Sequence, residues 1–147
     1  MKVEIRIDPA RREPEAVIYA PRVTPELEAL AQRLAAEDDA PRLTAYTERG
    51  AVFLPLSDVL RLYAERQQVF AQTPNGTYAV RQRLYELEEN LAPHRFVRIS
   101  NSEIVNARKI TGMDFSLTGT IRLTLRTGIE TYASRRYVSK IRKQFEV

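Results

Sequence analysis

The segment HRFVRISNSEIVNARKI, residues 94–110, combines hydrogen-bonding and cationic side chains in a pattern that suits nucleic-acid recognition. Its centre is a polar run at residues 100–102, between two apolar stretches that resemble strands, and Arg98 and Lys109 flank that run. An asparagine amide can pair with the edge of adenine, and serine hydroxyls suit phosphate oxygens. The structural alternative is a turn between two strands, which needs only one such side chain.

A second basic segment, SRRYVSKIRK at residues 134–143, places Arg135 and Arg136 in the first turn of an expected helix. Cations there oppose the positive end of the helix dipole, at a local cost of about 0.3–1 kcal/mol each. The same position lies beside free backbone N–H groups, which suits the binding of an anion such as a phosphate. For this segment alone, a solvated surface without a ligand is an equally good interpretation.

The distribution of charge supports the nucleic-acid interpretation. The net charge is +4, with 23 basic and 19 acidic side chains. Residues 94–147 hold 11 of the basic and 4 of the acidic side chains, a net charge of +7, which leaves 12 and 15, or −3, for residues 1–93. Such asymmetry is typical of a nucleic-acid footprint in the C-terminal third. A solvated basic surface without a ligand is again the alternative.

Catalytic chemistry has little support in the composition. The 147 residues include Cys 0 and His 1, too few for a thiolate metal site, a cysteine nucleophile or a histidine-rich zinc site. The Gly 5 are isolated, and no glycine-rich phosphate loop occurs. Glu88 and Glu89 are adjacent in an expected helix, point in different directions, and are predicted to lie on a solvated face. We therefore expect no enzyme activity, no catalytic residue, no metal and no cofactor.

Short strands dominate the expected structure from residue 43 onward, so the predicted fold class is mainly β with short helices (α+β). Strands are predicted near residues 43–47, 51–56, 69–73, 77–80, 96–99, 103–106 and 108–113, with a hairpin at 120–133. Asn75-Gly76 predicts a type I′ hairpin turn, and Thr127-Gly128 predicts another turn. Residues 57–68 are ambiguous between helix and strand. Helices are expected at 81–91 and after Ser134, which would be an N-cap.

Residues 1–41 are predicted to form a small N-terminal strand and helix segment, and residues 42–147 the main domain. Alternating residues predict strands at 3–8 and 16–20, and a threonine N-cap followed by proline predicts an amphipathic helix at 25–37. Because so small a segment cannot bury its apolar face alone, we expect it to mediate dimerisation or to have a regulatory role. The chain has no apolar run of roughly 20 residues and no signal peptide, which predicts a soluble cytoplasmic protein.

The motif F-x-R-x-x-x-S-x-I-V-N closely resembles the signature of the LytTR-type DNA-binding domain of bacterial transcriptional regulators. The motif residues are Phe96, Arg98, Ser102, Ile104, Val105 and Asn106. The stretches LPLSDVLRLYAE, GTYAVRQRLYELEENL and TLRTGIETYASRRYVSKIRK resemble further parts of the family pattern in the same order, so that the resemblance covers residues 43–146. It implies an elongated arrangement of antiparallel sheets, with loops that enter successive major grooves at repeated sites and no recognition helix.

The resemblance also implies roles for individual residues. Base reading is expected from the turn after the early strand pair, from the residues before the motif serine and from the start of the last helix: Gln67, Gln68, Ser100, Asn101, Arg135 and Arg136. Contacts with the DNA backbone are expected from Arg66, Arg98, Ser102, Lys109, Tyr132, Ser134 and Lys140. Many family members have a histidine or arginine where Ser100 stands, so this shorter side chain is expected to read less or to read through water.

The leading hypothesis is a sequence-specific DNA-binding transcriptional regulator. The 41 leading residues are too few for a phosphoacceptor receiver domain, so the chain resembles the stand-alone members of the family and is expected to be controlled by abundance, a partner or dimerisation. The expected partners are double-stranded DNA and a second copy in a homodimer, with an unidentified regulatory protein left open. The alternative is a protein-interaction module, an anti-regulator that keeps the fold without operator binding. An RNA-binding β domain ranks lower because no stacking platform is evident.

Overall fold

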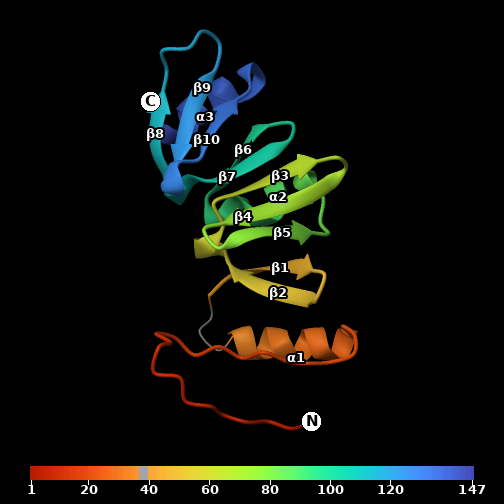
Figure 1. Ribbon diagram of the computed structural model, residues 1–147. Helices are drawn as coiled ribbons and strands as arrows, with labels where there is room; N and C mark the ends of the chain where they lie inside the picture. The colour runs from red at the N-terminus through yellow and green to blue at the C-terminus, as the bar shows by residue number, and fades with distance from the viewer. Residues whose placement is uncertain (37–39) are drawn as a thin grey trace.

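The computed structural model describes residues 1–36 and 40–147 and has the chain rising as a column of layers from α1 (Pro25–Ala35) to the C-terminal sheet (Figure 1). A seven-stranded antiparallel sheet has the order β2-β1-β5-β4-β3-β7-β6, and a three-stranded antiparallel sheet has the order β10-β9-β8. The predicted class, mainly β with short helices, is confirmed. In the part of the chain that is described, no helix is long and apolar enough to cross a membrane.

The seven-stranded sheet is built from β1 (Arg42–Thr47), β2 (Gly50–Pro55), β3 (Arg61–Glu65), β4 (Gln68–Thr73), β5 (Gly76–Val80), β6 (Phe96–Ser100) and β7 (Glu103–Asn106). The second sheet is built from β8 (Ile110–Asp114), β9 (Ile121–Leu125) and β10 (Glu130–Ala133). The other helices of the main domain are α2 (Leu84–Leu91) and α3 (Val138–Phe145). Short 3-10 turns, η2 (Leu56–Asp58), η3 (Ala92–His94), η4 (Ala107–Lys109), η5 (Arg126–Gly128) and η6 (Arg135–Tyr137), connect them.

Strands β6 and β7 lie between two hydrophobic cores. On one face, Phe96 and Ile104 pack with the apolar side of α2, which contributes Leu84, Leu87 and Leu91. On the other face, Val97, Ile99 and Val105 pack with the second sheet and with Ile141 of α3. All four residues of β7 are therefore buried, although a strand at a solvent-facing sheet has a buried residue only at every second position.

Two polar side chains of β7 are buried at its ends and join distant parts of the chain. The amide of Asn106 donates to the carbonyls of Val59 at 2.9 Å and Leu56 at 3.4 Å, and its oxygen accepts from the Arg108 N–H at 3.1 Å. The carboxylate of Glu103 accepts from the Thr131 hydroxyl at 2.7 Å, which links the two sheets. Burial makes such bonds costly to lose, because an unpaired buried polar group keeps its full desolvation penalty.

Most of the expected elements of the main domain are present, with corrections in the turns. The β4–β5 hairpin forms, but Thr73 pairs with Gly76, so its two-residue loop is Pro74 and Asn75. A type I′ turn needs a positive φ at its first loop residue, which the ring of Pro74 forbids, so the predicted turn type is wrong. The ambiguous stretch at 57–68 contains the end of η2, strand β3 and the start of β4.

The start of the last helix also differs from the prediction. Residues 135–137 form a 3-10 turn before α3, and the Ser134 side chain makes no capping hydrogen bond; the backbone N–H of Tyr137 donates to the Ser134 carbonyl at 2.9 Å instead. The Thr127-Gly128 turn is confirmed, with φ values of 72° and 83°.

The N-terminal helix is present, but the two N-terminal strands are not. Helix α1 begins after Thr24, whose hydroxyl accepts from the Leu27 N–H at 3.2 Å, and ends at Ala35; the expected end at residue 37 lies outside the described residues. Residues 3–8 and 16–20 are not assigned as strands and are mostly exposed. The alternation that predicted them is real, but a strand also needs a neighbouring strand to accept its hydrogen bonds.

Asn106→Ala is expected to lower the free energy of unfolding by about 3 kcal/mol, because it removes the donor to the carbonyl of the buried Val59 and the acceptor of the Arg108 N–H. Urea unfolding followed by circular dichroism measures the change. The matched control is Asn90→Ala, an exposed asparagine of α2, for which a change within about 0.5 kcal/mol is expected. Equal changes in the two variants would contradict the anchoring role of Asn106.

Candidate nucleic-acid interface

The polar run at residues 100–102 forms the tight turn between β6 and β7. A register shift between Arg98 and Ser100 marks a bulge just before the turn. The Ser100 hydroxyl accepts from the Ser102 N–H at 3.2 Å, and the two serine hydroxyls lie 3.4 Å apart. Asn101 stands exposed at the tip of this turn. The side chains that were predicted to read and grip DNA are thus presented on a turn with internal hydrogen bonds.

The Arg98 side chain stabilises this turn. Its Nε donates to the Ser100 carbonyl at 2.6 Å, and its Nη2 donates to the Asn101 carbonyl, also at 2.6 Å. Its Nη1 donates to Glu88 at 3.1 Å, and its side chain is only 12% exposed. Arg98 was expected to contact the DNA backbone. In the structure it instead positions the β6–β7 turn, and three of its side-chain nitrogens already donate hydrogen bonds.

Glu88 was missed as part of the site because sequence spacing could not reveal its partners. It was predicted to lie on a solvated helix face. In the structure it joins α2 to Arg98 of β6, and its other oxygen lies 3.7 Å from Nζ of Lys140 on α3. This carboxylate therefore orients two cationic side chains from elements that are far apart in the sequence.

The start of the last helix lies against the same turn. The Ser134 N–H donates to the Ile99 carbonyl at 2.9 Å, and the Tyr137 hydroxyl donates to Oδ1 of Asn101 at 3.4 Å. Tyr137 was also missed by the sequence analysis, because its partner is 36 residues away. Both Arg135 and Arg136 of η6 are exposed. The two basic segments found in the sequence are therefore adjacent in space.

Gly119, in the loop before β9, leaves room for the Arg135 side chain to lie against the loop. Its φ of +77° suits glycine, and an added Cβ would lie 2.8 Å from Nε of Arg135. In the same loop region, hydrogen bonds from Ser116 hold the pKa of Asp114 below its usual value, and Arg122, at 2.7 Å, also favours the charged form. Within the described residues, no carboxylate forms a salt bridge with Arg135 or Arg136.

A third loop, between β3 and β4, lies on the other side of the turn. The Ala64 N–H donates to the Ser102 carbonyl at 2.8 Å, which continues the pairing of β3 with β7. Beyond it, Arg66 and Gln67 have φ values of 52° and 67°, as the two loop residues of a type I′ hairpin require. These two residues and Gln68 are exposed.

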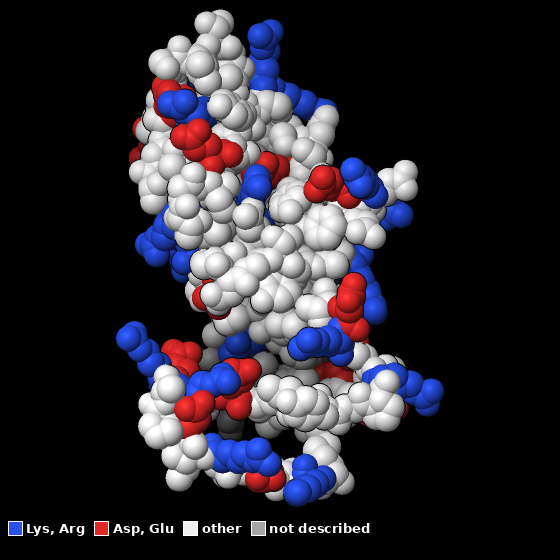
Figure 2. Space-filling model, in the orientation of Figure 1, with Lys and Arg blue, Asp and Glu red and all other residues white. Residues whose placement is uncertain are grey.

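The three loops lie along one edge of the domain, at the right in Figure 1, where the β3–β4 turn, the β6–β7 turn and the start of the last helix follow one another. Lys and Arg side chains project beside the last helix and beside the β3–β4 turn on this edge in Figure 2. Tyr132, which is 52% exposed, and Ser134 come just before η6, and the Lys140 side chain is 58% exposed. Lys109 is the exception, because η4 follows the opposite end of β7, and the four residues of β7 alone span about 13 Å at the usual rise of a strand.

This geometry is that of a β-rich domain that presents loops from two antiparallel sheets along one edge. Helices α2 and α3 are separated by five strands and do not form a helix-turn-helix pair. The family model of the LytTr DNA-binding domain matches residues 49–146. The chain belongs to the LytTR family of DNA-binding domains.

Individual relatives agree with this assignment. The chain is 31% identical over 147 residues, covering 100% of this chain and 99% of each relative, to proteins of Staphylococcus aureus strains MSSA476 and NCTC 8325 that are named HTH-type transcriptional regulators. Among solved structures, the LytTr DNA-binding domain of a protein described as a methyl-accepting/DNA response regulator from Bacillus cereus is 26% identical, with a TM-score of 0.69. That match covers 72% of this chain and 97% of the solved chain, and it supports the predicted LytTR-like arrangement of sheets.

Arg98→Met is expected to loosen the β6–β7 turn, because a methionine of similar length cannot donate to the carbonyls of Ser100 and Asn101. Hydrogen exchange of the residue 100–102 amides should accelerate about tenfold or more, which corresponds to a loss of about 1.4 kcal/mol of local stability. The control is Glu88→Gln, which leaves both bonds from Arg98 to the turn in place and is expected to have a smaller effect. Unchanged exchange in Arg98→Met would contradict the positioning role.

Proposed function

We propose that this protein is a sequence-specific transcriptional regulator that reads double-stranded DNA through its three loops, with the loops in successive major grooves. The observation that carries this proposal is their convergence on one edge, where hydrogen bonds from Ala64, Ser134 and Tyr137 all end on residues 99–102. Membership of a DNA-binding family and the names of the relatives, transcriptional regulators, support the same class of function.

In this proposal, Asn101 and Arg136 read bases most directly. An asparagine amide makes a bidentate pair with adenine and an arginine with guanine, each contributing about 1–3 kcal/mol of discrimination. Among the described residues, the Nδ2 of Asn101 has no acceptor, and its Oδ1 accepts a 3.4 Å bond from the Tyr137 hydroxyl, which can rotate away. Arg136 is exposed and has no carboxylate partner among the described residues.

The remaining base-reading positions have supporting roles in the proposal. Gln67 and Gln68 present amides on the rigid β3–β4 turn, at one end of the edge. Ser100 reads through water, because its hydroxyl already accepts from the Ser102 N–H. Arg135 lies beside Gly119 and reaches the groove next to Arg136.

Contacts with phosphates surround these positions and set the register of the protein on DNA. We assign them to side chains that are polar or cationic and lie on or near the same edge: Arg66, Ser102, Tyr132, Ser134 and Lys140. Lys109 is the phosphate contact furthest from the loops, beyond the other end of β7. Arg98 acts indirectly, by fixing the turn that carries Asn101.

The alternative, an interaction module without operator binding, is favoured by one observation, the exposed apolar side chains of residues 1–20. Selection of bound duplexes from a random library, with the purified full chain at moderate salt, separates the two functions. Enrichment of a short repeated motif, with copies about one helical turn or a multiple of it apart, supports the regulator. Sequence-blind binding or no binding overturns base reading and favours the interaction module.

Asn101→Ala and Arg136→Ala are each expected to weaken binding to the selected sequence by about 1–3 kcal/mol while binding to random DNA changes little. Fluorescence anisotropy with the two duplexes measures both affinities. The matched controls are Asn75→Ala and Arg126→Ala. Both residues are exposed and lie in turns at the ends of β4 and β10 that are away from the three-loop edge. Equal losses on specific and random DNA would reject the base-reading assignment.

Lys140→Ala is expected to weaken binding to both kinds of DNA and to lower the slope of log K against log salt by about one unit, because one phosphate contact is lost. Lys109→Ala should lower the slope by less, given its distance from the loops. Titrations at several salt concentrations provide the slopes, with Arg12→Ala in the N-terminal segment as the control. A slope that Lys140→Ala leaves unchanged would remove Lys140 from the phosphate contacts.

A further inference from the structure

The first eight residues have the properties of a strand without a partner. Val3, Ile5 and Ile7 are 81%, 93% and 92% exposed. Within the described part of the chain, residues 2–7 form no backbone hydrogen bond. Unpaired backbone groups next to exposed β-branched side chains are the features that pair with a strand from another chain.

The side chains of this segment are already divided between two faces. The Glu4 carboxylate lies 2.6 Å from Nε of Arg6 and 3.7 Å from Nζ of Lys2, so alternate charged side chains are on the same side. Residues two apart share one face of an extended chain, which places Val3, Ile5 and Ile7 together on the opposite face. The segment has one charged face and one apolar face.

The order of residues 2–8, KVEIRID, is complementary to itself in the antiparallel direction. When two copies are aligned antiparallel with Ile5 opposite Ile5, the numbers of any two residues that face each other add up to ten. Lys2 then faces Asp8, Glu4 faces Arg6, and Val3 faces Ile7. Every charged residue meets an opposite charge and every apolar residue meets another apolar residue, which is the favourable pattern for cross-strand neighbours.

We propose that residues 2–8 pair with the same residues of a second copy of this chain, as an antiparallel two-stranded ribbon with its two-fold axis at Ile5. The charge pattern favours a second copy as the partner strand, because a strand of unrelated sequence would not place an opposite charge at each charged position. Aligning the copies in parallel would instead place Glu4 near Glu4 and Arg6 near Arg6. Such an interface is isologous, as expected of a two-fold dimer.

The ends of the segment fit a strand of this length. The Asp8 carboxylate accepts from the Ala10 N–H at 3.1 Å, and the Asp8 carbonyl accepts from the Arg11 N–H at 3.1 Å, so the chain turns directly after Asp8. Pro9 has no N–H group to continue a ladder. The turn therefore ends the proposed ribbon at the residue where the self-complementary sequence also ends.

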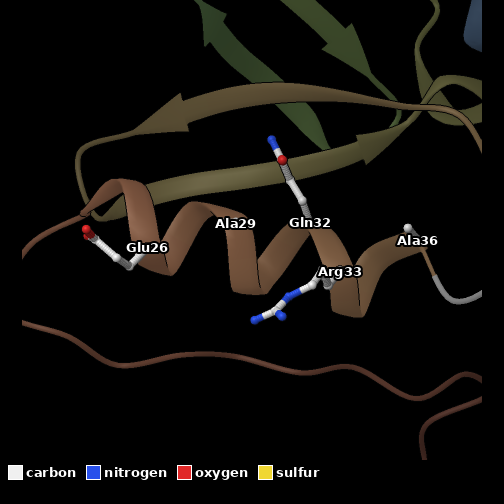
Figure 3. Close-up of a pocket in the computed structure, with 5 residues that line it drawn as sticks. All are labelled: Glu26, Ala29, Gln32, Arg33 and Ala36. Carbon is white, nitrogen blue, oxygen red and sulfur yellow. The ribbon is translucent and has the colours of Figure 1, made fainter.

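A two-stranded ribbon is only marginally stable in water unless its apolar face is covered. The structure offers cover along α1, where an open hollow of about 660 Å³ is lined by Glu26, Ala29, Gln32, Arg33 and Ala36. In Figure 3, Arg33 projects toward the extended N-terminal chain, while Gln32 points toward the sheet. The exposed Val17 and Tyr19 of the second extended segment add apolar surface that the same association would cover.

The consequence for function, which rests on the proposed DNA recognition, is that one dimer carries two DNA-binding domains. Binding of the second domain to a neighbouring site then becomes intramolecular, which can raise the apparent affinity by 10²–10⁴-fold when the spacing of the sites fits. The test of self-association below uses no DNA, so its failure is distinguishable from a failure of DNA recognition.

The experiment measures the association of the full chain by sedimentation equilibrium, with four proteins. The wild type is expected to form a dimer. Glu4→Arg alone and Arg6→Glu alone each place like charges opposite each other twice, and each is expected to raise the dimer dissociation constant about tenfold or more. The double variant, Glu4→Arg with Arg6→Glu, restores opposite charges and is expected to dimerise like the wild type.

Mixing the two single variants is the decisive step. In the mixed pair, position 4 of each copy again faces an opposite charge at position 6 of the other, so an equimolar mixture is expected to form a heterodimer although each variant alone is largely monomeric. Circular dichroism confirms that the variants are folded. A monomeric wild type, single variants that dimerise like the wild type, or a mixture that stays monomeric would each overturn the proposal.

Discussion

The burial of β7 on both faces is the constraint on which the rest of the structure depends. A strand that separates two cores cannot slip in register, because a shift by one residue would exchange the side chains of the two cores. Its ends are fixed as well, by Glu103 next to the β6–β7 turn and by Asn106 next to η2. The turn before β7 therefore has a defined position relative to both sheets. The backbone of the turn is held in place because the strand that follows it is buried and because Arg98 donates to the carbonyls of Ser100 and Asn101.

Three acidic side chains of the domain form ion pairs within it. Glu88 pairs with Arg98 beneath the turn, Glu103 with Arg61 inside the sheet, and Asp114 with Arg122 in the second sheet. Each of these pairs satisfies a cation that faces the interior or another strand. The cations of η6 have no such partner among the described residues, so their field extends into solvent. A modest net charge is therefore compatible with a basic edge, because the distribution of charge, more than its sum, determines the potential at an edge.

The N-terminal segment and the edge that carries the three loops have one property in common, exposed groups that have no partner among the described residues. At the edge, exposed amides and guanidinium groups are held on stiff turns, so they lose little entropy when a ligand arrives. In residues 2–8, the exposed apolar side chains lie on an extended chain, and the proposed partner strand would cover them. In Figure 1 the extended N-terminal chain lies below α1, whereas the three loops lie further up along the right side of the column, so an association of the N-terminal segment is remote from this edge.

Local chemistry in the sequence was sufficient to determine most strands and helices of the main domain, since alternation, proline stops and the Thr127-Gly128 turn depend on near neighbours. It also pointed to the polar run and the basic helix start as one kind of site. Tertiary structure alone decided that Arg98 positions the turn, that Glu88 orients cations, and that Lys109 lies away from the loops. It also decided that residues 3–8 and 16–20 do not become strands within one chain. The reason is the same in each case: hydrogen bonds and ion pairs between residues far apart in sequence leave no periodic signal, and a strand exists only when another strand meets it.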